Sequence, residues 1–141
     1  MDGLITQGHR LMQNLALDTN AYTALGRGDQ VLSDLITGVV HIGLPMTVIG
    51  EIYFGMLNGI QQKSNSLLFE RFLSNTRVEI LNITDDTAKL YGEIATELRR
   101  LGYPIQQNDI WIAALCKQYG YRLATNDSGF INITGLELIN F

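Results

Sequence analysis

The 141-residue sequence contains little of what several large protein classes require. Cys116 is the only cysteine, so the chain can form no internal disulfide and no cysteine-based zinc site of its own. No apolar run approaches the roughly 20 residues of a membrane-spanning helix, and the first residues show no signal-peptide pattern. The two histidines, His9 and His41, have no evident catalytic or metal-binding partner. We therefore expect a cytoplasmic protein without membrane association, zinc or Ser-His-Asp chemistry.

Phosphate-binding signatures and a strongly basic composition are also missing. The sequence has no P-loop and no Gly-x-Gly-x-x-Gly, so the usual phosphate cradle for a nucleotide cofactor is absent. The formal net charge is -4, which does not give the excess positive charge typical of nucleic-acid-binding surfaces. Four acids discussed below equal this whole charge excess, and a bound cation would neutralise much of it. The charge therefore neither favours nor excludes a nucleic-acid substrate.

Length and hydrophobic content fit a single folded domain. The 46% of hydrophobic residues is enough to form a core of ordinary size. Residues 1–14 show no clear periodicity, and we expect them to be a leader that is flexible or loosely attached. The domain is expected to comprise residues 15–141.

Apolar runs typical of strands alternate with segments of helical periodicity. The predicted strands cover residues 15–18, 39–44, 77–81, 121–125 and 136–139. The predicted helices cover residues 20–25, 29–37, 47–57, 64–75, 84–101 and 108–119. This alternation is typical of α/β proteins with a mainly parallel sheet covered by helices on both faces. In such sheets, ligands bind beyond the carboxyl ends of the strands, where the strand order reverses.

Capping residues and apolar periodicity refine the predicted helices. The predicted N-caps are Asp29, Thr47, Thr84 and Asn108. The apolar spacing predicts two inward faces, formed by Val48, Ile49, Ile52 and Met56 in one helix and by Leu67, Leu68 and Phe72 in the next. The helix 108–119 is apolar nearly all round, so we expect it to be buried on more than one side.

Four acids, Asp18, Glu51, Asp109 and Asp127, lie where predicted strands end or within helices that follow them. Each has an ordinary structural explanation as a turn, cap or solvated helix residue. Together at one sheet edge they would repel one another strongly unless a divalent cation lay among them. Oxygen ligands of this kind suit Mg²⁺ or Mn²⁺. The combination predicts a metal-dependent phosphoryl-transfer enzyme.

The order and context of these acids resemble a PIN-domain ribonuclease, and more narrowly a VapC-type toxin of a type II toxin-antitoxin system. The motifs are Leu-Asp-Thr-Asn at 17–20, Thr-Val-Ile-Gly-Glu at 47–51, Asn-Asp-Ile-Trp-Ile-Ala-Ala at 108–114 and Leu-Ala-Thr-Asn-Asp-Ser-Gly-Phe at 123–130. The resemblance covers residues 15–141.

The resemblance implies a fold, an activity and partners. The fold would be a PIN-like three-layer α/β domain with a five-stranded parallel sheet. The activity would be Mg²⁺- or Mn²⁺-dependent endoribonuclease cleavage of RNA, often tRNA. The protein would form a homodimer and be inhibited by a cognate antitoxin, whose arginine often enters the acidic site in this family.

We ranked the expected site residues. Asp18 and Asp109 are the preferred direct metal ligands, followed by Glu51 and then Asp127, which could act through water or a second metal ion. A carboxylate not occupied by metal would orient or deprotonate the attacking water. Residues placed to hydrogen-bond these carboxylates or the substrate phosphate are Thr19, Asn20, Thr125 and Asn126.

Alternatives and partner surfaces remain open at this stage. The chain could instead be a catalytically inactive PIN-like binding protein, or a non-toxin nuclease acting on ribosomal RNA or DNA. An antitoxin groove is expected around Ile52, Tyr53, Met56 and Leu57 together with the following helix. Basic residues that would influence substrate choice are Arg27, Lys63, Arg99 and Arg100, whose positions the sequence does not give.

Overall fold

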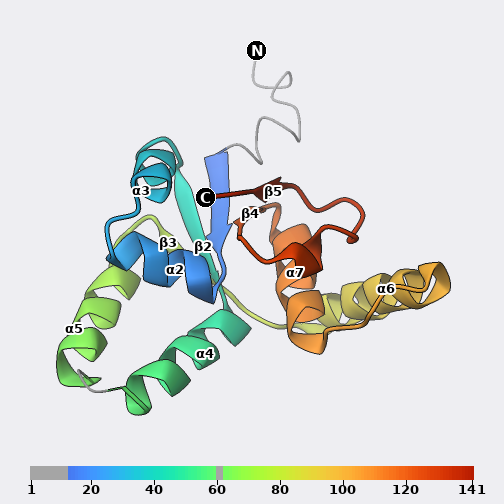
Figure 1. The fold of residues 1–141 in the computed structure, drawn as a ribbon, viewed down its shortest axis with the longest axis horizontal. Coiled ribbons are helices and arrows are strands. Elements are labelled where there is room, and N and C mark those ends of the chain that lie inside the picture. Colours follow the sequence, from blue (N-terminus) through green and yellow to red (C-terminus); the bar gives the residue numbers. More distant parts are fainter. Residues whose placement is uncertain (1–12, 60–61) are drawn as a thin grey trace.

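The protein contains one five-stranded sheet in which all paired strands are parallel (Figure 1). The computed structural model describes residues 13–59 and 62–141. The strands are β1 (Asn14–Leu17), β2 (His41–Pro45), β3 (Val78–Leu81), β4 (Arg122–Ala124) and β5 (Leu138–Ile139). Their spatial order is β3-β2-β1-β4-β5. This arrangement confirms the predicted α/β fold with a parallel sheet.

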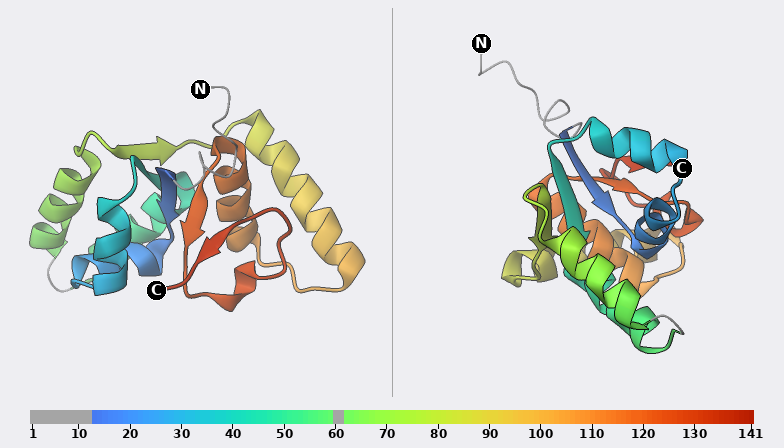
Figure 2. Two further views of the ribbon diagram at one scale, coloured as in Figure 1. Left: turned by 90° about the horizontal axis from the view of Figure 1, so that it is seen from above. Right: turned by 90° about the vertical axis from the view of Figure 1, so that its left-hand side faces the viewer.

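Helices connect the strands and flank the sheet (Figures 1 and 2). They are α2 (Thr19–Gly26), α3 (Gln30–Thr37), α4 (Met46–Leu57), α5 (Gln62–Leu73), α6 (Asp85–Leu101), α7 (Gln107–Tyr119) and the short 3₁₀ helix η2 (Ser128–Phe130). Helix α6 packs along α7 and lies at one end of the molecule, as Figure 1 and the left view of Figure 2 show. Among the described residues, no helix is both long and apolar enough to cross a lipid bilayer.

The strand order reverses at the centre of the sheet. From β1 the chain adds β2 and β3 on one side, then returns to place β4 and β5 on the other. The strands β1 and β4 are therefore neighbours, with Leu17 paired to Ala124 at their carboxyl ends. A reversal of this kind leaves a crevice beyond the strand ends, because the connections depart in opposite directions.

The central strand and helix α7 form the middle of the core. Leu15, Ala16 and Leu17 of β1 are fully buried, as expected for a parallel strand covered on both faces. In α7, Ile110, Ala113 and Cys116 are also fully buried. Burial on several sides of α7 confirms the prediction for this helix.

Two of the four predicted helix caps are confirmed and two are wrong. Asp29 caps α3 by accepting a hydrogen bond from Leu32 N at 3.0 Å, and Thr84 forms a capping box with Thr87. The cap predicted at Thr47 is wrong, because α4 already begins at Met46 with Pro45 in the cap position. The side chain of Pro45 makes no capping hydrogen bond, and its fixed φ of −58° suits the entry into a helix.

The cap predicted at Asn108 is also wrong. Helix α7 begins at Gln107, with Gln106 in the cap position and no side-chain capping bond. Asn108 lies in the first turn, where its amide is directed to a carboxylate on another helix, described below. The sequence correctly placed Asn108 at the start of this helix, but it did not predict that the Asn108 side chain binds Glu51.

The predicted inner face is confirmed for α4, whereas in α5 it is confirmed for Phe72 and wrong for Leu67 and Leu68. Val48, Ile49, Ile52 and Met56 are the buried residues of α4. In α5, however, Leu67 and Leu68 are 54% and 58% exposed, whereas Phe69 is fully buried. The ring of Phe69 packs edge-on against Tyr22 and Tyr53, with centroid separations of 5.4 and 5.3 Å. These aromatic contacts rotate the helix relative to the prediction, because the larger apolar side chain gains most from burial.

Strand and helix boundaries differ from the predictions by a few residues. β2 begins at His41 rather than at residue 39 and includes Pro45, while α5 begins at Gln62 rather than at residue 64. β1 begins at Asn14, one residue before the predicted start. Residues 1–12 of the predicted leader lie outside the described residues.

Substitution of Gly43 in β2 tests how closely the sheet is packed. A Cβ at this position would lie 2.8 Å from the Tyr121 ring and 3.1 Å from Leu81 Cδ1. The Tyr121 hydroxyl donates to Glu79 Oε2 at 2.7 Å, which holds the ring in place. We expect Gly43→Ala to lower the free energy of unfolding by about 1–3 kcal/mol, because an added methyl group overpacks a filled core.

The matched control is Gly50→Ala in α4, where a Cβ would meet no atom within 4 Å. Alanine has a higher helix propensity than glycine, so this variant should be as stable as the original protein or more stable by up to about 1 kcal/mol. Both values can be measured by urea unfolding. Equal stability of the Gly43→Ala variant and the original protein would contradict the close packing described here.

Candidate active site

Asp18 lies directly beyond the carboxyl end of β1 and is the N-cap of α2. Its Oδ1 accepts a hydrogen bond from Ala21 N at 2.8 Å, and its Oδ2 accepts one from Thr125 Oγ1 at 2.5 Å. The residue is only 5% exposed. The carboxylate is therefore held in one orientation by a helix terminus and by the neighbouring strand end, and each oxygen keeps a second lone pair.

Thr125 links Asp18 to the segment that carries Asp127. The Thr125 hydroxyl donates to Asp18 Oδ2 and also accepts from Asp127 N at 3.0 Å. The side chain of Asp127 caps the 3₁₀ helix η2, with Oδ1 accepting from Gly129 N at 2.9 Å. The two acids that follow β1 and β4 are thus fixed relative to each other by one buried hydroxyl.

Asp109 reaches the same region from the first turn of α7. Its Oδ2 lies against the backbone of Gly129, since a Cβ built on that glycine would be only 2.5 Å from this oxygen. The same Cβ would be 3.3 Å from Asp127 Oδ1. The absence of a side chain at Gly129 therefore leaves room for the carboxylates of Asp109 and Asp127 on the side where a Cβ would lie.

Glu51 projects from α4 and is held by α7. Its Oε1 accepts a hydrogen bond from Asn108 Nδ2 at 2.6 Å. Asn108 directly precedes Asp109, so a single helical turn supplies both a carboxylate and the amide that positions another. The sequence offered little signal for this contact beyond the adjacency of Asn108 and Asp109.

The four acids interact electrostatically with one another. The pKa of Asp109 is raised from its ordinary value of 3.8 to about 6. Burial is the largest cause, and repulsion from Asp127, Glu51 and Asp18 adds to it. The pKa of Asp18 is also raised, chiefly by burial, although the hydrogen bonds from Thr125 and Ala21 oppose the change. Mutual repulsion of this kind is expected where carboxylates share a confined region. The structure thus brings all four predicted acids to one place.

The donor chemistry of this cluster suits a hard divalent cation. All four side chains offer oxygen atoms, and a cation would relieve the repulsion that raises the pKa of Asp109. Within residues 13–59 and 62–141, however, no group of three or more His, Cys, Asp or Glu side chains is already arranged to hold a metal ion. Glu51 and Asp127 are the exposed members of the cluster, whereas Asp18 is buried and Asp109 is half-buried.

The predicted supporting residues occupy different positions around the acids. Thr125 contacts Asp18 directly. Thr19 Oγ1 is buried and has no hydrogen-bond partner in the described part of the chain, so a polar group near Asp18 is unsatisfied. Asn20 and Asn126 line a hollow beside α2 and contact none of the four carboxylates through a side-chain hydrogen bond. Of the four predicted supporting residues, Thr125 is therefore the one that hydrogen-bonds a carboxylate of the cluster.

Two residues that the sequence analysis did not assign to the site contribute to its geometry. Gly129 provides the close backbone approach to Asp109, and Asn108 fixes Glu51. A glycine two residues after the Asp127 cap was a usable signal, because close backbone approach commonly requires glycine. The Asn108 contact joins residues 57 positions apart and had no local signature.

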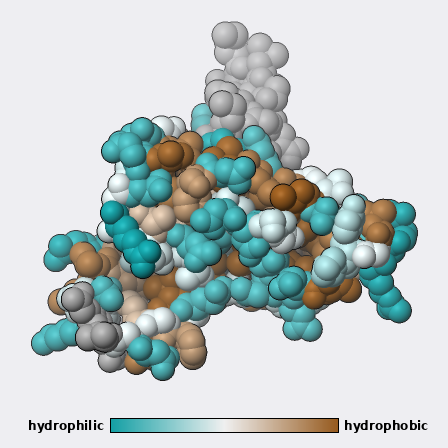
Figure 3. Space-filling view, viewed as in Figure 1, coloured by the Kyte–Doolittle hydropathy of each residue, from teal (hydrophilic) through white to brown (hydrophobic). Residues whose placement is uncertain are grey.

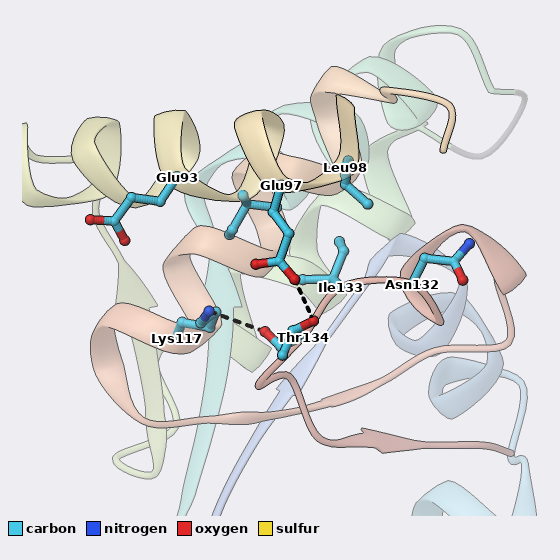
Figure 4. Close-up of a pocket in the computed structure, with 8 residues that line it drawn as sticks. Glu93, Glu97, Leu98, Lys117, Asn132, Ile133 and Thr134 are labelled. Atoms are coloured by element: carbon cyan, nitrogen blue, oxygen red, sulfur yellow. Dashed lines mark hydrogen bonds between the residues drawn. The ribbon is translucent and has the colours of Figure 1, made fainter. Parts of the chain in front are cut away.

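A separate small cavity of about 90 Å³ lies between α6, α7 and the segment before β5 (Figure 4). Thr134 Oγ1 donates to Glu97 Oε1 at 2.8 Å, and Lys117 Nζ donates to Thr134 O at 3.1 Å. None of the four acids lines this cavity. Its polar groups bind one another, and they attach the segment before β5 to the two helices.

The raised pKa of Asp109 predicts how stability depends on pH without metal. Because the folded state binds this proton more tightly than the unfolded state, stability falls as pH rises from about 4 to about 6 and stays reduced above that range. Asp109→Asn removes the charge, so in EDTA it should raise the free energy of unfolding at neutral pH by about 1 kcal/mol and change little near pH 4.

The control for this prediction is Glu70→Gln, which neutralises an exposed carboxyl on α5. Urea unfolding at the two pH values should show no pH-dependent gain for this variant. Adding Mn²⁺ should reverse the order, stabilising the original protein more than Asp109→Asn, because a ligand of the folded state adds stability. A loss of stability in Asp109→Asn at neutral pH in EDTA would contradict the repulsion described here.

Comparison with known proteins gives consistent matches over almost the whole chain. The family model of the PIN domain matches residues 15–136. Ribonuclease VapC2 of Haemophilus influenzae is 30% identical over 118 residues, covering 82% of this chain and 88% of that protein. Ribonuclease VapC2 of Rickettsia felis is 31% identical over 101 residues, covering 71% of this chain and 74% of that protein.

Solved structures show the same fold. The crystal structure of VapBC2 from Rickettsia felis, bound to a DNA fragment from its promoter, contains a chain with a TM-score of 0.80 and 26% identity. The match covers 90% of this chain and 98% of that one. VapBC-1 from nontypeable Haemophilus influenzae gives a TM-score of 0.79 at 22% identity, with coverage of 89% and 96%. On the family model and the relatives of 30% identity, this chain belongs to the PIN-domain family and, within it, to the VapC ribonucleases.

Proposed function

We propose that the protein is a divalent-metal-dependent endoribonuclease that acts as the toxin of a toxin-antitoxin pair. The observation that carries this proposal is the convergence of Asp18, Glu51, Asp109 and Asp127 at the strand-order reversal, where their charges interact. The names of the matched relatives, ribonuclease VapC, support the same reaction. The proposed metal is Mg²⁺ or Mn²⁺, with Asp18 and Asp109 as the principal ligands.

The fixed residues of the site would orient the reacting groups. Asp18 is locked by Thr125 and by the amino end of α2, so its free lone pairs point in a set direction. Asn108 limits the motion of Glu51 through their hydrogen bond. A bound Mg²⁺ or Mn²⁺ would supply Lewis-acid polarisation of the scissile phosphate and a lower pKa for the attacking water.

Asp109 is suited to handle a proton near neutral pH. Burial and repulsion raise its pKa to about 6, so its carboxylate accepts a proton more readily than an ordinary aspartate does. Its position against Gly129 leaves little room for water on that side. We propose that the carboxylate left free of metal receives the proton of the attacking water, which is Glu51 when Asp109 binds the metal ion.

We propose single-stranded RNA, and tRNA in particular, as the substrate class, following the family resemblance. Single-strand selectivity is consistent with an open site whose acids lie at a sheet edge, because unpaired nucleotides can approach such a site more closely than a duplex can. Sequencing the RNA ends that appear after induction in cells would identify the RNA and the cleaved bond.

We also propose a homodimer, following the family resemblance. Light scattering would measure its mass in solution.

An apolar groove beside the acids supports an antitoxin partner. An opening of about 540 Å³ between α2, α4 and α5 is lined by Tyr22, Ile52, Met56 and Leu68, with Glu51 at the same groove. Further exposed apolar side chains on these helices are Tyr53, Phe54, Leu57 and Leu67. Hydrophobic surface is visible in Figure 3 at the lower left, over α4 and α5.

This geometry agrees with the groove expected from the sequence, with one refinement. Ile52 and Met56 are buried and line the groove, whereas Tyr53 and Leu57 are exposed. We propose that an amphipathic antitoxin segment places apolar side chains in this groove and a cationic side chain near Glu51. The matched VapBC structures, which are toxin-antitoxin complexes, support a partner of this kind.

Substitution of the acids tests the nuclease proposal. Asp18→Asn and Asp109→Asn should each reduce RNA cleavage in Mg²⁺ or Mn²⁺ by at least about 100-fold, because each removes a charged oxygen from the reacting centre. EDTA should abolish cleavage by the original protein. Asp86→Asn, on the exposed first turn of α6, is the control and should retain activity. Unchanged cleavage by either site variant would refute the assignment.

Substitution of an exposed leucine tests the antitoxin groove. Leu68→Glu places a charge in the apolar groove and should weaken binding of the protein encoded by the neighbouring open reading frame by at least about tenfold. Leu101→Glu, an exposed leucine on α6, is the matched control. Co-purification and calorimetry measure the effect. Equal binding by the two variants would show that the groove is not the antitoxin site.

A further inference from the structure

A second hollow adjoins the apolar groove along α2, and Thr23 and Arg27 line both. It has a volume of about 390 Å³, within the range of roughly 300–1,000 Å³ that is usual for small-ligand sites. Its polar lining includes Asn20, Thr23, Arg27 and Asn126, and the ring of Phe141 also lines it. Amide, guanidinium and aromatic groups are therefore gathered in one open depression.

The hollow begins beside the acidic site. Asn20 lies two residues after Asp18, and Asn126 directly precedes Asp127. Asn20, Thr23 and Arg27 are spaced by three and four residues, so they lie on one face of α2 and its C-cap. At 1.5 Å per residue this face extends about 10 Å away from the acids, a distance that accommodates one to two nucleotides of a single strand.

Arg27 is available to bind an anion. Across residues 13–59 and 62–141, its guanidinium makes no ion pair or side-chain hydrogen bond, and it lines both this hollow and the apolar groove. Asp29 also lines the hollow, but its Oδ1 is occupied by Leu32 N at the start of α3.

Other basic side chains are placed differently. Arg77 Nη1 donates to Ile36 O and Val39 O, and Lys117 donates to Thr134 O. Arg99 lies in the last turn of α6. Of the basic residues that the sequence suggested for substrate choice, Arg27 is therefore the one that shares a hollow with Asn20 and Asn126.

We propose that this hollow binds one nucleotide of single-stranded RNA adjacent to the bond that is cleaved. Arg27 binds the phosphate of that nucleotide, the amides of Asn20 and Asn126 hydrogen-bond its base or ribose, and Phe141 provides an apolar ring for stacking. The proposal rests on the nuclease function proposed above. It assigns Arg27 to substrate binding and gives it no part in bond cleavage.

The test compares Arg27→Ala with Arg71→Ala, which removes the same charge from an exposed position on α5 that lines neither the hollow nor the groove. Steady-state cleavage of a mixed-sequence single-stranded RNA of about 12 nucleotides is measured in Mn²⁺ at several salt concentrations. Arg27→Ala should raise KM about tenfold while kcat stays within about twofold, because a phosphate contact outside the reacting centre is lost. Its plot of log(1/KM) against log[salt] should be shallower by about 0.7.

Two further variants separate charge from shape. Arg27→Lys should recover most of the KM and of the salt dependence, since a point charge can still bind phosphate. Phe141→Leu should raise KM about fivefold without changing the salt dependence, because stacking is lost but no charge is removed. Arg71→Ala should match the original protein in KM, kcat and salt dependence. Thermal unfolding of each variant verifies that it is folded.

The outcomes distinguish this subsite from the proposed nuclease function. Failure of the original protein to cleave RNA with Mg²⁺ or Mn²⁺ would refute the function itself. If the original protein cleaves RNA and Arg27→Ala has unchanged KM and salt dependence, the subsite alone is refuted. A lower kcat at constant KM, or weaker antitoxin binding without a change in KM, would also overturn it.

Discussion

The pairing of β1 with β4 is the constraint on which the candidate site depends. These strands are neighbours only because the chain reverses its strand order at the centre of the sheet, and their pairing ends at Leu17 and Ala124. The next residues along each strand are Asp18 and Thr125, which share a buried hydrogen bond of 2.5 Å. Asp109 is then added from α7, which packs against β4, and Glu51 from α4, which packs against β2 and α7. The parallel sheet thus determines where the acids meet.

Burying Asp109 beside three other carboxylates costs stability, and its raised pKa, caused first by burial and then by repulsion, records that cost. The surrounding structure offsets it. Asp18 is satisfied by two hydrogen bonds, and the fully buried strand β1 lies directly beneath it. Gly129 allows Asp109 to approach without a steric clash. Destabilised groups held by a rigid scaffold are expected at functional sites, where binding of a ligand rather than folding relieves the strain.

The sequence predicted the features that depend on local pattern and missed those that depend on tertiary contacts. Strand-helix alternation and the position of Asp18 at a strand end were readable because burial on both faces gives an uninterrupted apolar run. The cap at Asn108 and the inward orientation of Leu67 and Leu68 were wrong. Asn108 is used by Glu51, 57 residues away, and the aromatic contacts of Phe69 rotate α5. Neither partner is visible in local periodicity.

The two surfaces proposed for partners adjoin each other along helix α2. One is the apolar groove proposed for an antitoxin and the other is the polar hollow proposed for a nucleotide, with Thr23 and Arg27 lining both. Both surfaces begin next to the acids, so an antitoxin segment that reaches Glu51 would also affect the approach of RNA. Inhibition and substrate binding would then be coupled by proximity to the same carboxylates, without any change of fold.

The central claim is that the four acids form one divalent-metal site, and anomalous X-ray scattering from crystals grown with Mn²⁺ tests it most directly. The account predicts an anomalous peak in contact with the carboxylates of Asp18 and Asp109, with oxygen ligands at about 2.0–2.2 Å. It also predicts that the peak disappears in Asp109→Asn. An absent peak at saturating Mn²⁺, or a peak bound elsewhere while these acids stay apart, would contradict the account.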